Sequence, residues 1–232
     1  MTEKLPILLV PGLNCSARLY AAQVPFLWRY GPVTVADHTR DDSVAGMARR
    51  ILADAPPRFA LIGLSMGGYI AFEMLRQAAG RIAKLGLLDT GARADAPEAT
   101  EKRKSQIEMA LAGRFAEIPD LQFPGLVHAR HQGDEALKAV VRQMAQETGP
   151  EGFVNQQRAV MTRPDSRPGL SAIRCPALVL VGDGDTLTPP ALAEEIAAGI
   201  SGSRLVVVPG AGHLSTLEQP DAVNAALADL LK

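Results

Sequence analysis

A serine stands between two glycines in the segment Gly63-Leu64-Ser65-Met66-Gly67. The segment follows an apolar run and precedes residues with helical apolar spacing, so it fits a G-x-S-x-G motif on a strand–turn–helix. The two glycines allow the backbone to close tightly around the serine. We interpret Ser65 as a candidate nucleophile for attack on a carbonyl carbon, the alternative being a structural glycine-rich turn.

A serine hydroxyl becomes a good nucleophile only beside a general base that is itself oriented by a third group. Among the four histidines, His213 is the candidate base, because it lies in a glycine-rich loop between the last predicted strand and the last predicted helix. Such a loop at the carboxyl edge of a sheet can project a side chain over the serine. A loop histidine with a local hydrogen bond is the alternative.

The orienting carboxylate should follow a strand that lies between the serine and the histidine in sequence. Asp185 is the preferred candidate, because it comes after a tight turn and precedes a helix opened by Thr188 and Pro189. Asp183 is interpreted more simply as a turn residue. Asp89, at the end of the strand after the serine's helix, remains a third candidate.

The other histidines indicate less. His128 and His131 are three residues apart and would share a helix face. No carboxylate or cysteine follows them at metal-ligand spacing, so a solvated or substrate-facing surface is the simpler interpretation. His38 follows a predicted strand and receives no role. With no phosphate-binding glycine loop either, the sequence predicts no metal and no cofactor.

The order Ser65, Asp185, His213 is the chain order of the α/β-hydrolase triad. On these motifs the sequence resembles the α/β-hydrolase superfamily over almost its whole length, in particular compact bacterial members with a helical cap. The resemblance implies an oxyanion hole made by the backbone N–H groups of Met66 and Leu13.

The chain departs from the family pattern in the loop that contains Leu13. This segment usually reads His-Gly-x in the family, whereas Pro11 precedes Gly12 here. The family's histidine is chiefly structural, so the backbone donor is expected to remain.

Along the chain, short apolar runs alternate with segments whose apolar residues have helical spacing, and these elements must position the candidate residues. This alternation predicts an α/β fold, with a mostly parallel sheet flanked by helices on both faces. The predicted strands are 5–10, 33–36, 59–62, 85–88, 177–181 and 204–208. The predicted helices are 43–54, 66–79, 190–198 and 222–231.

The stretch 92–167 contains no convincing strand, and amphipathic helices are expected at 98–112, 134–146 and 152–161. An unstructured loop of this length would be unusual. We therefore predict a hydrolase core of 1–91 and 168–232, with 92–167 inserted as a helical cap.

A mostly apolar substrate pocket is expected between the serine and the cap. Its predicted lining residues are Leu13, Asn14, Met66, Phe123, Leu126, Phe153, Met161 and Leu187. Packing between cap helices is the alternative for the cap members. Arginines of the cap and its exit are candidates for binding a substrate carboxylate, or else they are solvated or paired with neighbours such as Asp165. These arginines are Arg130, Arg158, Arg163 and Arg167.

Composition excludes several classes of function. The chain has 232 residues, with 24 Lys and Arg against 25 Asp and Glu, so it lacks the basic signature of nucleic-acid binding. The N-terminal apolar run is too short for a secretory signal, and no stretch approaches the roughly 20 apolar residues that span a bilayer. We expect a cytoplasmic monomer or homodimer that acts on a small molecule, without membrane insertion.

The two cysteines, Cys15 and Cys175, make neither a disulfide framework nor a metal-ligand spacing, and reduced thiols are expected. Cys15 lies near the predicted active-site loop, so a reactive thiol is an alternative to a small buried residue.

Together these patterns favour a serine hydrolase that cleaves a small carboxylic ester or thioester through an acyl-enzyme. One alternative keeps the triad but acts as an enol-lactonase or carbon–carbon bond hydrolase. The other is a non-catalytic small-molecule binder on the same fold.

Overall fold

Six strands form one sheet in the order β2-β1-β3-β4-β5-β6, and every pairing between neighbours is parallel. The computed structural model describes residues 4–232; residues 1–3, which the prediction assigned to the core, lie outside the described residues. The predicted α/β fold is confirmed. The strands are β1 (Ile7–Val10), β2 (Val33–Val35), β3 (Phe59–Leu64), β4 (Ile82–Leu88), β5 (Ala177–Gly182) and β6 (Arg204–Val208).

Side chains alternate between the two faces of the sheet along each strand, as the pleat requires. In β1, Leu8 and Val10 belong to one buried cluster, whereas Ile7 and Leu9 belong to a second. Both faces are therefore apolar, which explains why the strand sequences are apolar nearly throughout.

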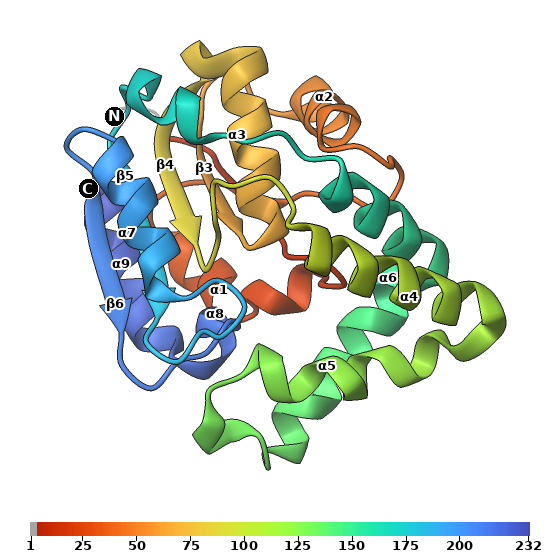
Figure 1. Cartoon of the computed structure of the whole chain (residues 1–232). Coiled ribbons are helices and arrows are strands. Elements are labelled where there is room, and N and C mark those ends of the chain that lie inside the picture. The colour runs from red at the N-terminus through yellow and green to blue at the C-terminus, as the bar shows by residue number, and fades with distance from the viewer. Residues whose placement is uncertain (1–3) are drawn as a thin grey trace.

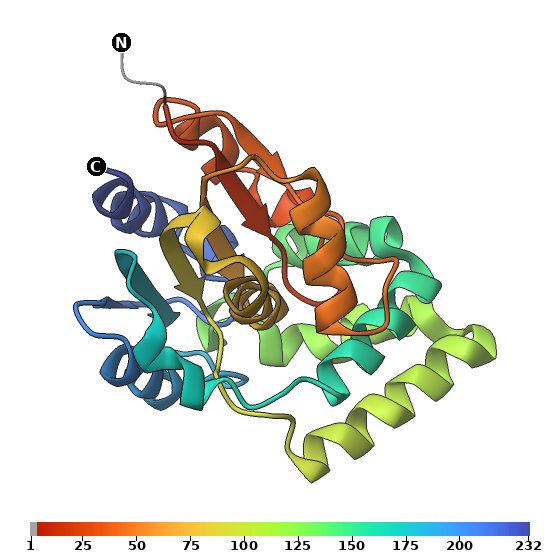
Figure 2. The same ribbon diagram turned by 90° about the horizontal axis from the view of Figure 1, so that it is seen from above.

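Helices cover both faces of the sheet (Figure 2). The first cluster includes residues of α2, α3 and α7, and the second includes residues of α1 and α9. The bounds of these helices are α1 (Gln23–Leu27), α2 (Val44–Asp54), α3 (Met66–Ala78), α7 (Pro190–Gly199) and α9 (Pro220–Leu231); the short α8 (Ser215–Glu218) precedes α9.

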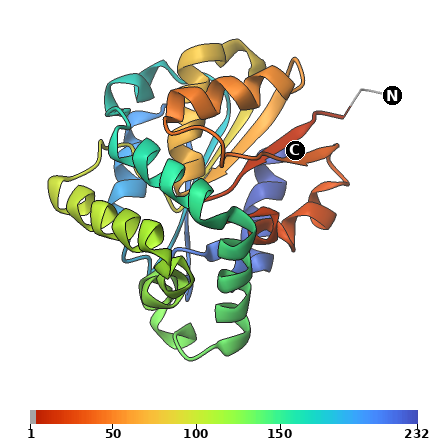
Figure 3. The same cartoon turned by 90° about the vertical axis from the view of Figure 1, so that its right-hand side faces the viewer.

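Between β4 and β5 the chain forms helices and no strand, and Figures 1 and 3 show this part, in green, gathered beside the sheet. The principal helices are α4 (Pro97–Met109), α5 (Ile118–Leu126) and α6 (Glu135–Met161). The two predicted helices 134–146 and 152–161 both lie within α6, and Gly149, with non-helical angles of φ 72° and ψ 163°, forms the kink between them, as its glycine and the following proline predicted.

The prediction missed α5, because its two prolines were interpreted as breaks. Pro119 occupies the first turn of α5, where a backbone N–H has no intrahelical acceptor, so proline is tolerated there. Pro124 lies in the last turn of the same helix.

None of the helices in the described part of the chain has the length and apolar character of a membrane-spanning helix.

Candidate active site

Ser65 lies at the turn between β3 and α3, with a positive φ of 54° and ψ of −115°. A non-glycine residue rarely adopts this backbone conformation, and it costs about 1–3 kcal/mol. The flanking glycines make the turn possible. A Cβ atom at Gly63 would lie 2.3 Å from the Gly67 oxygen, and one at Gly67 would lie 2.0 Å from the Val10 oxygen. The G-x-S-x-G spacing is thus a requirement of close backbone packing.

Ser65, His213 and Asp185 form one hydrogen-bonded chain. The Nε2 atom of His213 lies 2.8 Å from Ser65 Oγ, and Nδ1 of the same ring lies 2.8 Å from Asp185 Oδ2. Asp185 and His213 are 3% and 4% exposed, so water screens this pair little. The fold brings together residues that are 148 and 28 positions apart in sequence.

The carboxylate of Asp185 is held by the start of the following helical segment. Its Oδ1 accepts hydrogen bonds from the backbone N–H groups of Leu187 and Thr188, both at 2.9 Å. Its Oδ2 accepts from Thr188 Oγ1 at 2.6 Å. These bonds fix the orientation of the acid that faces the imidazole of His213.

The charges of the pair set the pKa of each partner. Burial by itself lowers the pKa of His213, but the charge and hydrogen bond of Asp185 outweigh it, so this pKa lies above its ordinary value. Burial raises the pKa of Asp185, but the charge of His213 and the surrounding hydrogen bonds hold it below its usual range. Both directions favour an ionised Asp185 beside a His213 that takes up a proton readily.

Asp89, the third candidate acid, occupies a different environment. It is fully buried, its Oδ1 accepts the N–H of Gly182 at 2.9 Å, and its Oδ2 contacts Ser215 Oγ. Burial and the nearby charge of Asp185 raise the pKa of Asp89 well above its usual range. A neutral Asp89 is suited to bracing the loops after β5 and β6, and its surroundings favour Asp185 as the charged partner of His213.

The loop that carries His213 is also braced by residues the sequence analysis did not select. Asp183, interpreted as a turn residue, accepts the N–H of Gly210 at 2.7 Å. Glu218, which the analysis missed, accepts the N–H of Gly212 at 2.8 Å through Oε1. The available signal was a carboxylate five residues after His213, at the end of α8.

His128 and His131, between α5 and α6, also contact Glu218. Its Oε2 accepts the backbone N–H of His128 at 2.7 Å and lies 2.9 Å from Nδ1 of His131. Across residues 4–232, no group of three or more His, Cys, Asp or Glu side chains is arranged to hold a metal ion.

Two backbone N–H groups face no protein acceptor beside Ser65. Within the described part of the chain, the N–H groups of Leu13 and Met66 form no hydrogen bond, whereas the next one in the loop, that of Asn14, donates to Gln156 Oε1 at 2.8 Å. Free donors at these two positions are what an oxyanion hole requires.

The loop around Leu13 is held by His38 and Gln156, which the analysis left without a role. His38 Nε2 lies 3.0 Å from the Gly12 carbonyl oxygen, and Gln156 Oε1 accepts the backbone N–H of Asn14 at 2.8 Å. Both side chains are buried. The position of His38 directly after a strand was the only signal in the sequence.

A cavity of about 390 Å³ opens beside Ser65 and His213. Of the eight predicted lining residues, the structure places four at this cavity: Leu13, Met66, Leu126 and Leu187. A larger cavity of about 560 Å³ lies at the amino-terminal ends of the strands, next to Arg58 and Pro176 and remote from Ser65.

The other four predicted lining residues lie elsewhere. Phe123 and Phe153 are 1% and 0% exposed and belong to apolar clusters, where Phe153 packs on Phe115 with ring centroids 5.4 Å apart. Asn14 is buried and its backbone N–H donates to Gln156, and Met161 lies at the end of α6. Both phenylalanines therefore pack in apolar clusters and do not line the cavity beside Ser65.

None of the four arginines predicted as candidate carboxylate ligands lines the cavity. The basic residues that do line it are Lys102 and Arg103 of α4, which were not predicted. Arg167 pairs with Asp165 at 2.6 Å, as the alternative interpretation expected. Arg163 pairs with Asp95 at 2.6 Å.

Cys15 lines the cavity but is not a reactive thiolate, because burial raises its pKa to about 12. A small buried residue is therefore the better interpretation. Cys15 and Cys175 are both free.

The chain matches known proteins along nearly its whole length. A model of the alpha/beta hydrolase family matches residues 7–226. A pimeloyl-(acyl-carrier protein) methyl ester esterase of Edwardsiella ictaluri is 28% identical over 229 residues, which cover 95% of this chain and 85% of that protein.

Solved structures of similar proteins agree with this match. An esterase of Thermogutta terrifontis superimposes with a TM-score of 0.88 and 33% identity, covering 99% of this chain and 90% of that one. An enol-lactonase of Burkholderia xenovorans also has a TM-score of 0.88, with 26% identity and coverage of 99% and 92%.

Proposed function

The chain belongs to the alpha/beta hydrolase family, and from this membership and the site geometry we propose that it is a serine hydrolase of a small carboxylic ester or thioester. The proposal rests on one observation. The Oγ of Ser65 is linked to the carboxylate of Asp185 through the imidazole of His213 by two hydrogen bonds of 2.8 Å. Similarity to the esterases of Edwardsiella ictaluri and Thermogutta terrifontis supports an ester as the bond that is cleaved.

The first half-reaction acylates the serine. His213 Nε2 accepts the proton of Ser65 as Oγ attacks the carbonyl carbon, and Asp185 stabilises the imidazolium that forms. The N–H groups of Leu13 and Met66 donate to the developing oxyanion. When the tetrahedral intermediate collapses, the bond to the leaving alcohol or thiol breaks, and that group takes the proton from His213.

The second half-reaction releases the acid. A water molecule gives a proton to His213 Nε2 and attacks the acyl carbon, and the same two N–H groups stabilise the oxyanion. The bond to Ser65 Oγ then breaks, and the serine recovers its proton from His213. No further reactant is needed.

As part of this proposal, residues 92–167 act as a cap over a core of 1–91 and 168–232. The support is that Leu126 of α5 and Lys102 of α4 line the same cavity as Ser65. A cap of this kind limits access of bulk water and determines which substrates fit. The two free cysteines fit the cytoplasmic location that the proposal includes.

A lactone is a second candidate substrate, because it is a cyclic ester that the same residues can open. The similarity to the enol-lactonase of Burkholderia xenovorans favours this candidate. The mechanism would differ only in that the leaving alcohol stays attached to the acyl group.

The proposal is tested with Ser65→Ala and, as a control, Ser171→Ala, which changes an exposed serine of the 3-10 helix Arg167–Ala172. Turnover of a short-chain aryl ester should fall by about 10⁴-fold or more in Ser65→Ala and stay unchanged in the control. Labelling by a fluorophosphonate should be lost in parallel, while both variants keep the far-UV circular dichroism of the parent. Undiminished turnover in Ser65→Ala rejects the mechanism, and a parent protein that resists the probe favours a non-catalytic binder.

A further inference from the structure

Helix α4 presents cationic and polar side chains to the cavity beside Ser65. Ala99, Lys102, Arg103 and Gln106 all line this cavity. Their spacing of i, i+3, i+4 and i+7 places them on one face of the helix. A helix face that covers an apolar pocket is normally apolar, so two cations on this face call for a chemical reason.

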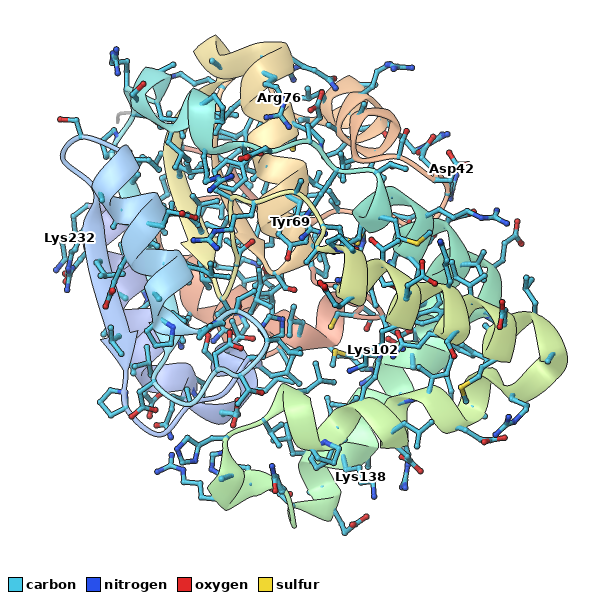
Figure 4. All side chains as sticks on the ribbon, viewed as in Figure 1. Asp42, Tyr69, Arg76, Lys102, Lys138 and Lys232 are labelled. Atoms are coloured by element: carbon cyan, nitrogen blue, oxygen red, sulfur yellow. The ribbon has the colours of Figure 1, made fainter. Side chains whose placement is uncertain are left out.

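The positive charge of Lys102 is not neutralised within the described part of the chain. No Asp or Glu lines the cavity, and Lys102 forms no ion pair or side-chain hydrogen bond among residues 4–232. Lys104, two positions further along α4, instead pairs with Glu101 at 2.7 Å. Figure 4 labels Lys102 on α4 and Tyr69 on α3, two residues that line the same cavity from different helices.

The wall next to Lys102 carries further excess positive charge. Asp95 accepts from Arg163 Nη1 at 2.6 Å and lies 3.2 Å from Arg103 Nε, so one carboxylate faces two guanidinium groups. The guanidinium of Arg163 also lies 4.4 Å from the centre of the Tyr69 ring. Because Arg103 and Arg163 are already engaged, they contribute mainly through their electrostatic field, and Lys102 is the cation free to contact a ligand.

Gln106 supplies a neutral donor one helical turn after Lys102. Its Oε1 accepts hydrogen bonds from Gln122 Nε2 at 3.2 Å and from Gln157 Nε2 at 2.7 Å. These two bonds orient the Gln106 amide so that its NH₂ group, which has no protein acceptor in the described residues, is left for a ligand.

We propose that the substrate carries a carboxylate in addition to its ester or lactone bond, and that Lys102 binds this carboxylate with Gln106 as a second donor. This inference rests on the proposed function, because it assigns the substrate class of the same site. The ester carbonyl lies at Ser65 and the carboxylate lies against α4. A cavity of about 390 Å³ is suited to a small molecule of this kind.

The test compares two methyl esters of equal chain length, monomethyl glutarate and methyl pentanoate, which differ only in the terminal carboxylate. Steady-state kinetics are measured for the parent protein, Lys102→Met and the control Lys104→Met. The parent protein should have a higher kcat/KM for monomethyl glutarate than for methyl pentanoate. In Lys102→Met the ratio of these two kcat/KM values should fall about tenfold, because one charge-assisted hydrogen bond to the substrate is lost. The loss should lie in KM, and Lys104→Met should keep the parent ratio.

Binding provides a readout that does not need turnover. In the Ser65→Ala background, calorimetry should show that adding Lys102→Met weakens binding of monomethyl glutarate about tenfold. In the Ser65→Ala background, this binding should also weaken as salt rises, because the lysine is at the exposed rim of the cavity.

The possible failures are distinguishable. If the parent hydrolyses both esters without preferring the glutarate, or if the Lys102 and Lys104 variants behave alike, the carboxylate inference is wrong and the proposed hydrolase function stands. If neither ester turns over and the fluorophosphonate does not react, the hydrolase function is wrong. Calorimetry then decides the carboxylate inference by itself, and equal binding with and without Lys102 rejects it.

Discussion

The Nε2 atom of His38 lies 3.0 Å from the carbonyl oxygen of Gly12. A carbonyl oxygen can only accept a hydrogen bond, so Nε2 carries the proton and donates. Burial lowers the pKa of His38, which keeps the ring neutral. The loop after β1 has Pro11 where related proteins usually have a histidine, and His38 from the segment after β2 holds the same loop in place.

We predict that His38→Leu lowers kcat about 10- to 100-fold. Loss of the bond to Gly12 lets the Leu13 N–H move, and a full oxyanion donor is worth about 3 kcal/mol. KM should change much less, because the donor acts mainly in the transition state. Steady-state kinetics with the aryl ester as substrate measure both kcat and KM.

His38→Gln is the matched variant, because its side-chain NH₂ can restore the donor to Gly12. His38→Gln should recover most of the kcat that His38→Leu loses. A boronic acid that mimics the tetrahedral intermediate should bind weakly to the Leu variant and nearly as tightly to the Gln variant as to the parent. Equal losses in the Gln and Leu variants would show that His38 contributes only packing.

The pH dependence of kcat/KM follows from the pKa of His213. The imidazole must be neutral to accept the proton of Ser65, so activity should rise with pH through this pKa. Asp185 holds the pKa above the ordinary histidine value of 6.5, so the half-maximal point should lie above pH 6.5. A half-maximal point below that value in a full pH profile would contradict the assignment of Asp185 as its charged partner.

Asp185→Asn should reduce kcat/KM by about 10⁴-fold, because the amide favours the wrong imidazole tautomer and no longer stabilises the imidazolium. Removal of the negative charge lowers the pKa of His213, so the acid limb of the residual activity should shift to lower pH. Asp183→Asn is the control, since an amide oxygen can still accept the N–H of Gly210. It should keep activity within a few-fold of the parent.

Asp89→Asn should also retain activity within about tenfold, although Asp89 lies close to the same loop. A neutral amide reproduces a protonated carboxyl: its oxygen accepts from Gly182, and its NH₂ donates to Ser215. Asparagine also tolerates the positive φ of 44° at this position. A loss as large as that of Asp185→Asn would instead identify Asp89 as the catalytic acid.

Asp89→Ala tests whether the Asp89 side chain stabilises the fold through its hydrogen bonds. It leaves the buried Gly182 N–H without an acceptor and should lower the free energy of unfolding by about 1–3 kcal/mol. Urea unfolding of the Ala and Asn variants measures the difference, which should be small for Asn.

Gly67→Ala should prevent accumulation of folded protein, because the added Cβ would lie 2.0 Å from the Val10 carbonyl oxygen. Gly80→Ala is the control, since a Cβ there meets no atom within 4 Å. The yield of soluble protein checks the prediction for both variants, and thermal unfolding is measured for each variant that can be purified. A Gly67→Ala protein that melts with the parent would show that the turn around Ser65 can relax.

Much of the fold was predictable because it depends on local patterns. The six strands were located from short apolar runs, since strands buried on both faces are apolar nearly throughout. The turn at Ser65 was predicted from the spacing of the glycines, and α3 from apolar residues at helical spacing. An error arose where proline was given too much weight, as in α5. The interruption predicted at Gly149 is present as a kink within α6.

The sequence by itself predicted the six strands, four of the helices that cover them and three residues in the chain order of a triad, because tight turns and strand ends impose strict requirements on residue type. Only the tertiary structure decided which other groups reach the site. Gln156 contacts Asn14 across 142 positions, and Lys102 lines the cavity of Ser65 from a different helix. Contacts of this kind depend on how helices pack against the sheet and against one another, and no local spacing in the chain encodes them.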